Sequence, residues 1–410
     1  MTAALALVGT ATAQEMRSLT GSATYLDRMA LPPEAVLLLE ATGPDGTLLA
    51  EARIPTEGRQ VPIPFTLGIP SGTDTTLRAG LAIDGQVLWL SEPVPVPVPV
   101  QGAGDTAKPG ALVLPRFQPV GFTSALRCTD GPYRLGFAGE AAVLGRDGAR
   151  IVLQPAPAAS GARFAAAEDP ATWVWLRGDR ALVSIAGAGP SECRAALPLP
   201  EGEFRAGGNE PFWSVTVARG SLSLARAGFE EVSLQVTDSD LSASGDIIVT
   251  ASDPTRALHV VLERGAEVCR DTMSGLPHPE TVALSMGDET LTGCGGDPWA
   301  LLTGRTWVVE EIGGAGVIEA AQATLGFDAA GRVFGNGSCN GFNGAVEMTG
   351  EGLAFGAVVT TMMACPEAVM AQERRLFDAL AGVHAFDIDD TGALVLIGPT
   401  GPALTARAAP

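Results

Sequence analysis

Residues 172–186 read TWVWLRGDRALVSIA and contain two short runs rich in aromatic and branched side chains, which favour β-strands. Gly178-Asp179 lies between the runs and predicts a tight turn. Because successive strand residues point to opposite faces, Val174 and Leu176 can face a core. The other face then carries two aromatic rings and one cation: Trp173, Trp175 and Arg177. The stretch therefore predicts two β-strands joined by a turn.

The same strand-and-turn pattern recurs along the whole chain of 410 residues. The 51 glycines and 30 prolines fall at turns, roughly every 8–12 positions, as in sandwiches and barrels. We expect a mainly β protein, a string of small antiparallel β-sandwich and β-barrel domains, with one helix in a C-terminal α+β domain. The expected domains are residues 17–118, 121–200, 202–297 and 298–410.

Residues 92–101 read EPVPVPVPVQ and allow two interpretations. Alternating prolines form a stiff polyproline spacer in many linkers. They are also tolerated on an edge strand, where Pro occupies positions that need no hydrogen-bond donor. We favour the edge strand because another strand-like run, GALVLPRF, follows at residues 110–117.

One helix is predicted near the C-terminus. Pro366 at the first helical position and Glu367 in the first turn both favour a helix start. Apolar residues then recur at helical spacing and predict one buried face: Val369, Met370, Leu376, Phe377 and Leu380.

The chain is strongly acidic, with 46 Asp and Glu against 26 Lys and Arg and a net charge of -20. Such a surface repels phosphate backbones and anionic lipid, so we expect no nucleic-acid partner. It attracts a basic protein. Since no apolar run is long enough to span a bilayer, we expect no stable membrane insertion.

Residues 1–14 resemble an export signal, with a short apolar core and the small residues Ala11-Thr12-Ala13 at a cleavage site. No Lys or Arg precedes Arg17, so an apolar N-terminus without export remains the alternative. No Cys follows the predicted cleavage site closely enough to carry a lipid. We expect an exported, periplasmic protein, with association at the outer membrane as a variant of this interpretation.

The six cysteines fall into three sequential pairs, each inside one expected domain. Six cysteines allow about 15 pairings, and this grouping favours the sequential one. Each disulfide would stabilise its domain by about 3–4 kcal/mol. The close Cys and His spacing of a metal site is absent, so we expect neither a metal nor another cofactor. The favoured pairs are Cys128–Cys193, Cys269–Cys294 and Cys339–Cys365.

Each expected domain resembles a bacterial envelope family. Residues 17–118, through LTGSATYLDRMALPP and QVPIPF, resemble the YbaY-type lipoprotein domain related to secretion pilotins. Residues 121–200, through SGARF and WLRG, resemble the MliC-type inhibitor of C-type lysozyme. Residues 202–297, through GNEPFW, CRDTMSG and LTGCG, resemble an uncharacterised envelope domain. Residues 298–410, through GNGSCNGFNG, TTMMACP and Glu373, resemble the META domain of HslJ.

The MliC resemblance implies a small β-barrel with a loop that enters the cleft of a C-type lysozyme. Ser160 would hydrogen-bond the general acid, Gly161 would allow a close approach, and Arg177 would pair with the ionised carboxylate. The family commonly has Lys where this chain has Arg177, and Arg is bulkier and forked. The implied lysozyme-binding residues are Ser160, Gly161, Arg163, Phe164, Trp175, Arg177 and Gly178.

A second function is compatible with the same sequence. The pilotin-like and META-like domains would bind envelope clients in stress or assembly, and the inhibitor fold would be an inherited scaffold. An enzyme is not expected, because no Ser-His-Asp order or nucleotide motif is present. The Gly335–Gly341 loop lacks the Lys of a phosphate-binding loop, and Cys339 lacks a neighbouring His base. We expect GNEPFW to be a turn that packs Phe212 and Trp213 into a core, with a ligand groove as the alternative.

Overall fold

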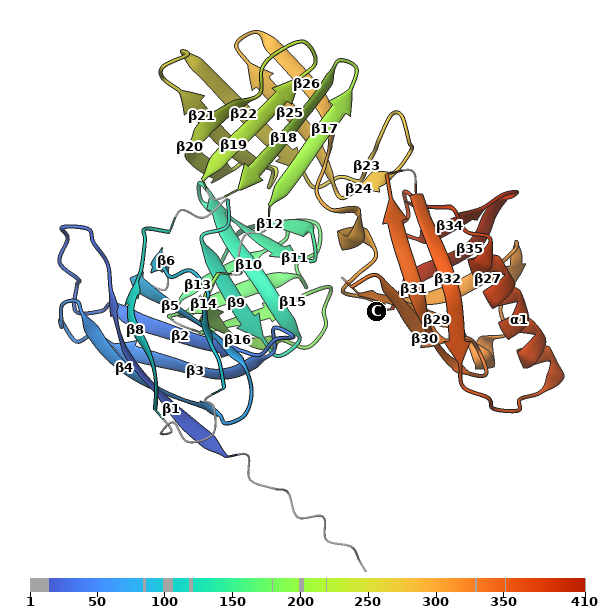
Figure 1. The fold of residues 1–410 in the computed structure, drawn as a ribbon, viewed down its shortest axis with the longest axis horizontal. Coiled ribbons are helices and arrows are strands. Elements are labelled where there is room, and N and C mark those ends of the chain that lie inside the picture. The colour runs from blue at the N-terminus through green and yellow to red at the C-terminus, as the bar shows by residue number, and fades with distance from the viewer. Residues whose placement is uncertain are drawn as a thin grey trace, which may run out of the picture. The chain divides into compact units, whose positions relative to one another are not determined.

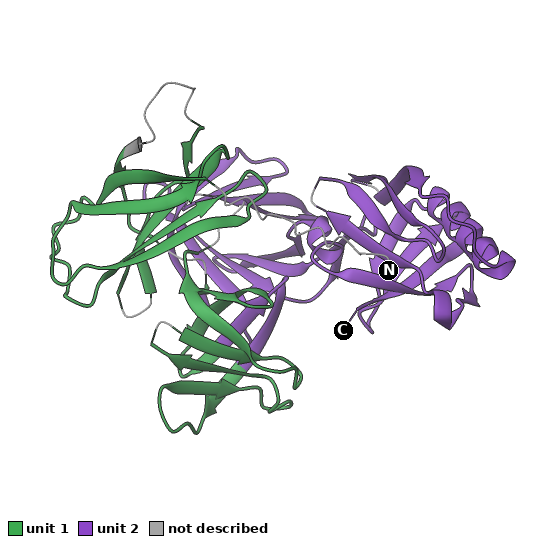
Figure 2. Ribbon diagram, turned by 90° about the horizontal axis from the view of Figure 1, so that it is seen from below, with its two compact units in different colours: residues 1–142, 153–199 green, residues 143–152, 200–410 purple. Residues whose placement is uncertain are grey.

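The computed structural model describes residues 15–409 except 84–85, 99–105, 118–120, 179, 199–202, 219, 329 and 351. The chain divides into two compact units, which Figure 2 shows in different colours. Unit 1 comprises residues 1–142 and 153–199, and unit 2 comprises residues 143–152 and 200–410. The described part is mainly β, as the sequence predicts.

The N-terminal segment is a β-sandwich. One sheet has the order β4-β1-β8, and the other has the order β3-β2-β5-β6 with β7 also paired to β5. The two sheets share one core, in which Leu19, Leu37 and Ile63 are fully buried. The strands are β1 (Met16–Thr24), β2 (Val36–Thr42), β3 (Leu48–Pro55), β4 (Ile63–Pro70), β5 (Thr75–Ile83), β6 (Gln86–Leu90), β7 (Val94–Val96) and β8 (Thr106–Val113).

Strand β7 decides between the two interpretations of the Val-Pro repeat. Val94–Val96 pairs with β5 in antiparallel register, so this part of the repeat is a strand and the favoured interpretation is confirmed there. Pro95 fits because, among the described strands, β7 pairs only with β5, as an edge strand does. The end of the repeat, residues 99–101, lies outside the described residues.

The next segment is a closed eight-stranded barrel with the order β10-β11-β12-β13-β14-β15-β16-β9, the first barrel (Figure 1). Its interior contains Leu153, Val174 and Val183, each almost completely buried. The strands are β9 (Ser124–Cys128), β10 (Gly131–Ala138), β11 (Ala141–Arg146), β12 (Ala149–Ala156), β13 (Ala162–Ala165), β14 (Trp173–Arg177), β15 (Arg180–Ser184) and β16 (Ser191–Ala196).

A second closed barrel follows, with the order β17-β18-β19-β20-β21-β22-β25-β26. A short separate hairpin, β23 with β24, interrupts it between β22 and β25. The strands are β17 (Phe204–Asn209), β18 (Phe212–Ala218), β19 (Ser221–Arg226), β20 (Val232–Leu241), β21 (Ile247–Asp253), β22 (Leu258–Gly265), β23 (Cys269–Arg270), β24 (Pro277–His278), β25 (Glu280–Met286) and β26 (Glu289–Gly295).

The C-terminal segment is one antiparallel sheet with the order β32-β31-β30-β29-β27-β35-β34-β33, and β28 also pairs with β27. The strands are β27 (Thr306–Ile312), β28 (Ala315–Gly316), β29 (Thr324–Asp328), β30 (Arg332–Asn336), β31 (Gly341–Thr349), β32 (Gly352–Thr360), β33 (Ala385–Ile388), β34 (Leu394–Gly398) and β35 (Gly401–Ala408). Two short 3-10 helices, η1 (Pro298–Leu301) and η2 (Glu319–Ala321), precede β27 and β29.

Helix α1 (Glu367–Ala381) packs its apolar face on this sheet, and Leu376 and Leu380 are buried. It differs from the expected helix in two ways. Pro366 is the N-cap with extended backbone, so the helix begins one residue later. The buried face also includes the polar residues Gln372 and Glu373, which an apolar periodicity does not reveal.

All three predicted disulfides are present. They join Cys128 to Cys193, Cys269 to Cys294 and Cys339 to Cys365. The predicted export signal, residues 1–14, lies outside the described residues. Within the part that the structure describes, no helix is both long enough and apolar enough to cross a membrane.

Candidate functional site

The loop between β12 and β13 is held against strand β14 by a tryptophan. The indole Nε1 of Trp175 donates a hydrogen bond of 2.7 Å to the carbonyl oxygen of Ser160. Strand β13 pairs with β14 so that Arg163 lies opposite Trp175. Ser160 and the end of β14 are therefore neighbours at one edge of the first barrel, although 15 residues separate Ser160 from Trp175 in sequence.

Gly161 makes this close approach possible. Its φ is +70°, in the left-handed region that favours glycine. A Cβ atom there would lie 2.1 Å from the carbonyl oxygen of Leu176 and 3.3 Å from Cγ of Arg177. Because backbone cannot move away as a flexible side chain can, only glycine fits this position.

Two arginines stack on the outward tryptophans. The guanidinium of Arg177 lies 4.7 Å from the ring centre of Trp175, and that of Arg163 lies 5.3 Å from the ring centre of Trp173. Cation–π contact orients a guanidinium and leaves its edge N–H groups free to donate. Arg177 is exposed and makes no ion pair with the described residues.

The acidic turn before β14 does not neutralise Arg177. Asp169 instead accepts hydrogen bonds of 2.5 Å from the Thr172 hydroxyl and 3.1 Å from the Ala171 N–H. These bonds fix a local turn. Val174, two residues further on, is completely buried, as the alternation predicts.

Phe164 lies apart from the other predicted site residues. It is opposite Val174 in the strand register, and its ring contacts the ring of Phe137 at 5.8 Å. Since Val174 faces the core, Phe164 faces the same side. The structure therefore groups Ser160, Gly161, Arg163, Trp175 and Arg177 at one surface, and Phe164 supports that surface from inside the barrel.

Arg180 is a further residue of this edge that was not among the predicted site residues. It lies opposite Arg177 in the register of β14 and β15, and both line a cavity of about 690 Å³. The signal was present in the sequence, because Arg177 and Arg180 flank a two-residue turn symmetrically. Gly178, the first turn residue, has a φ of +66°.

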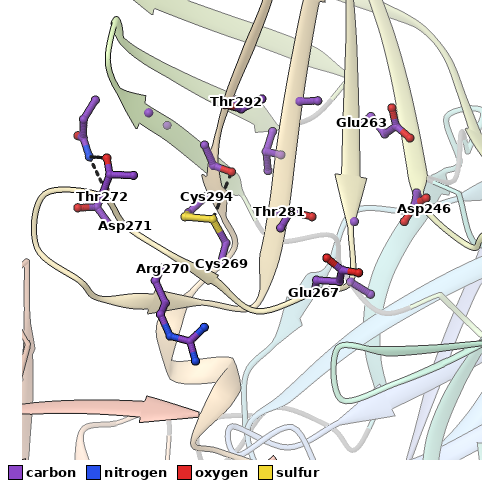
Figure 3. Close-up of a pocket in the computed structure, with 18 of the residues that line it drawn as sticks. Asp246, Glu263, Glu267, Cys269, Arg270, Asp271, Thr272, Thr281, Thr292 and Cys294 are labelled. Atoms are coloured by element: carbon purple, nitrogen blue, oxygen red, sulfur yellow. Dashed lines mark hydrogen bonds between the residues drawn. A yellow bond between two sulfur atoms is a disulfide. The ribbon is translucent and has the colours of Figure 1, made fainter. Parts of the chain in front are cut away.

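The second barrel carries a cavity of about 1070 Å³, shown in Figure 3. Asn209 of the GNEPFW stretch lines it and donates 2.8 Å to Asp271. Burial raises the pKa of Asp271, but hydrogen bonds from Ser274, Asn209 and Met273 outweigh it and lower that pKa to about 2. These bonds fix the loop that forms one wall of the cavity, beside the Cys269–Cys294 disulfide.

The prediction that GNEPFW packs both rings into a core is confirmed for Trp213 and wrong for Phe212. Trp213 is 1% exposed and its Nε1 donates 3.2 Å to the carbonyl oxygen of Thr292. Phe212 is 56% exposed. The two residues are consecutive in β18, so their side chains point to opposite faces and both cannot enter the same core.

The Gly335–Gly341 loop of the C-terminal segment is built around a buried carboxylate. Glu373 accepts 2.7 Å from the Asn340 N–H and 2.9 Å from the Asn340 side-chain amide. The side-chain oxygen of Asn340 in turn accepts from the Thr361 hydroxyl and the Met363 N–H. The network fixes the loop against helix α1.

Comparison with known families assigns three parts of the chain. Residues 127–192 match the family described as membrane-bound lysozyme-inhibitor of c-type lysozyme. Residues 14–108 match the type III secretion system lipoprotein chaperone (YscW), and residues 300–410 match the META domain. These matches confirm three of the resemblances, and that of residues 202–297 stays a prediction.

The matched families are inhibitor, chaperone and META domains, which are not enzyme families. The inhibitor and lipoprotein-chaperone matches indicate an exported envelope protein. No curated protein matches the chain. In the described part of the chain, no three His, Cys, Asp or Glu side chains are grouped as metal ligands would be.

Two solved structures are similar to parts of the chain. An alternative pilotin from the type II secretion system of Vibrio cholerae is 23% identical, over 26% of this chain and 100% of the pilotin, with a TM-score of 0.22. A protein from Burkholderia xenovorans is 22% identical, over 28% of this chain and 88% of its own, with a TM-score of 0.24.

Proposed function

We propose that this chain is an exported cell-envelope protein that inhibits C-type lysozyme through the first barrel. One observation carries the proposal. In the segment that matches the inhibitor family, Trp175 both donates to the Ser160 carbonyl and stacks on Arg177, which supports a shared role for Ser160 and Arg177. In this proposal the loop and the end of β14 enter the lysozyme cleft together.

The chemistry of the cleft explains the residue types. A retaining glycosidase has two carboxyl groups about 5–5.5 Å apart, one a general acid and the other ionised. The Ser160 hydroxyl would hydrogen-bond the general acid. Arg177, already oriented by Trp175, would form a charge-assisted pair with the ionised group. Gly161 lets the loop pass close to β14 without a side chain in the way.

Charge supports the encounter between the two proteins. A net charge of -20 attracts a basic lysozyme and raises the association rate at low salt. The two arginines of the site are then local positive charges aimed at the acidic cleft. We propose periplasmic residence and the four-domain division at residues 17–118, 121–200, 202–297 and 298–410 as parts of the same proposal.

The test is inhibition of a C-type lysozyme by the full chain with its disulfides intact. We expect Ser160→Ala and Arg177→Ala each to weaken inhibition at least tenfold. Arg134→Ala is the matched control, because Arg134 is an exposed arginine of β10 on the same barrel. If the parent chain does not inhibit at micromolar concentration, the proposal is wrong.

A second function is favoured by a surface of the C-terminal segment. Phe334, Val359 and Met362 are 48%, 67% and 98% exposed. Phe334 and Val359 line a cavity of about 470 Å³. Exposed apolar clusters are typical of interaction sites, as binding of an envelope client would require. Loss of cross-linked envelope proteins on Val359→Asp and Met362→Asp would support it, and unchanged cross-linking would contradict it.

A further inference from the structure

Four arginines form a row across four adjacent strands of the first barrel. Arg177 on β14 lies opposite Arg180 on β15, Arg180 lies opposite Arg194 on β16, and Arg194 lies opposite Arg127 on β9. Residues that are opposite each other in antiparallel strands point to the same face, with Cβ atoms about 5 Å apart. The row therefore brings guanidinium groups together on one surface.

Half of the row is neutralised by carboxylates of the N-terminal sandwich. Arg127 forms ion pairs of 2.8 Å with Glu40 and 2.7 Å with Glu51. Arg194 lies 3.9 Å from Glu51. These pairs account for the two arginines on β9 and β16.

The other half has no such partner among the described residues. Arg177 stacks on Trp175, and Arg180 makes no ion pair or hydrogen bond with the described part of the chain. Arg180 thus lies between two other arginines. Like charges directly opposite on neighbouring strands are destabilising, and an arginine cannot relieve the repulsion by losing its proton. An external anion would relieve it.

We propose that Arg180 is a second cationic contact of the inhibitory site and pairs with the second carboxyl group of the lysozyme cleft in its ionised form. The inference rests on the proposed function. Arg177 and Arg180 lie opposite each other with Cβ atoms about 5 Å apart, so their two long side chains can reach two carboxyl groups about 5–5.5 Å apart. Arg177 alone can pair with only one of them at full strength.

The inference changes the expected pH dependence of inhibition. The general acid of lysozyme has a raised pKa of about 6, so it is protonated at pH 5 and ionised at pH 7.5. A site with two arginines favours the ionised form, and inhibition then strengthens as pH rises through 6. On the described elements that surround the cavity, the charged groups near Arg180 are Arg177, Arg194, Arg127, Glu192 and Glu51.

The experiment measures the inhibition constant of the full chain against a C-type lysozyme from pH 5 to 7.5. We expect Arg180→Gln to weaken inhibition about tenfold at pH 7.5 and less than threefold at pH 5. Arg180→Lys keeps the charge and should recover most of the affinity. The matched control is Arg194→Gln, in the same row but already beside Glu51, and it should match the parent.

The outcomes separate this inference from the proposed function. If Arg177→Ala loses inhibition while Arg180→Gln matches the parent at every pH, only the role of Arg180 is wrong. If Arg180→Gln is weaker by the same factor at both pH values, or if Arg180→Lys does not recover, the contact with an ionised general acid is wrong. If the parent chain does not inhibit, both proposals are wrong. An unchanged melting temperature of each variant shows that the barrel is intact.

Discussion

Replacing Glu373 by alanine should destabilise the C-terminal segment more than any exposed substitution there. The variant removes two hydrogen bonds to a carboxylate, of 2.7 and 2.9 Å. It also leaves the Asn340 N–H, which is buried, without an acceptor. Hydrogen bonds to charged groups contribute about 1.5–3 kcal/mol each, and an unsatisfied buried donor costs about 1–3 kcal/mol. Because these contributions overlap, we expect a loss of about 3–5 kcal/mol.

Calorimetry of the full chain measures this loss as a shift of one transition. For a segment of about 100 residues, 1 kcal/mol shifts the melting temperature by about 4–8 °C, so the C-terminal transition should fall by at least 12 °C. Hydrogen exchange of the Asn340 amide should accelerate in the same variant. Glu347→Ala is the matched control, because Glu347 is an exposed glutamate on β31. A loss below about 1 kcal/mol for Glu373→Ala would refute the argument.

Three further predictions test other parts of the structure. Gly161→Ala should weaken lysozyme inhibition at least tenfold while the first barrel stays folded. The added Cβ would lie 2.1 Å from the Leu176 carbonyl oxygen and force the loop to move. Inhibition equal to that of the parent would contradict the close approach of the loop to β14. Trp213→Ala should lower the free energy of unfolding by about 3–5 kcal/mol in chemical denaturation, because the Trp213 ring is buried. Phe212→Ala should lower it by under about 1 kcal/mol, because the Phe212 ring is exposed. Equal losses would contradict the assigned faces of β18. The lowered pKa of Asp271, about 2, means that its contribution to stability is present above pH 4 and is lost as pH falls toward 2. Asp271→Asn should therefore be less stable than the parent at pH 6, with a difference that disappears near pH 2; a difference independent of pH would contradict the assignment.

Local sequence patterns predicted the fold well where one face of a strand is buried. The alternation in WVWLR placed Val174 inside and Trp175 outside, because side-chain direction in a strand depends only on position. The disulfide pairing also followed from sequence, since each pair lies within one segment.

The missed features depend on tertiary contacts. Glu373 and Gln372 are buried on a helix face where hydrogen-bond partners from distant loops satisfy them, and no helical periodicity shows such partners. Phe212 and Trp213 were grouped as aromatic neighbours, although consecutive strand positions cannot share a face. Arg180 flanks the turn symmetrically with Arg177 in the sequence, but only the strand register shows that Arg180 also lies opposite Arg194.

Strand β35 is the last strand in sequence, yet it lies inside the C-terminal sheet between β27 and β34. Its partner β27 is the first strand of that sheet. During synthesis of this segment, eight strands and helix α1 are therefore made before β35. Only β35 joins the part of the sheet that contains β27 to the part that contains β34. Until then, β27 and β34 each present an unpaired edge, which is a surface prone to aggregation. The sheet of this segment cannot be completed until β35 has been synthesised. During that interval the nascent chain would be a substrate for a chaperone.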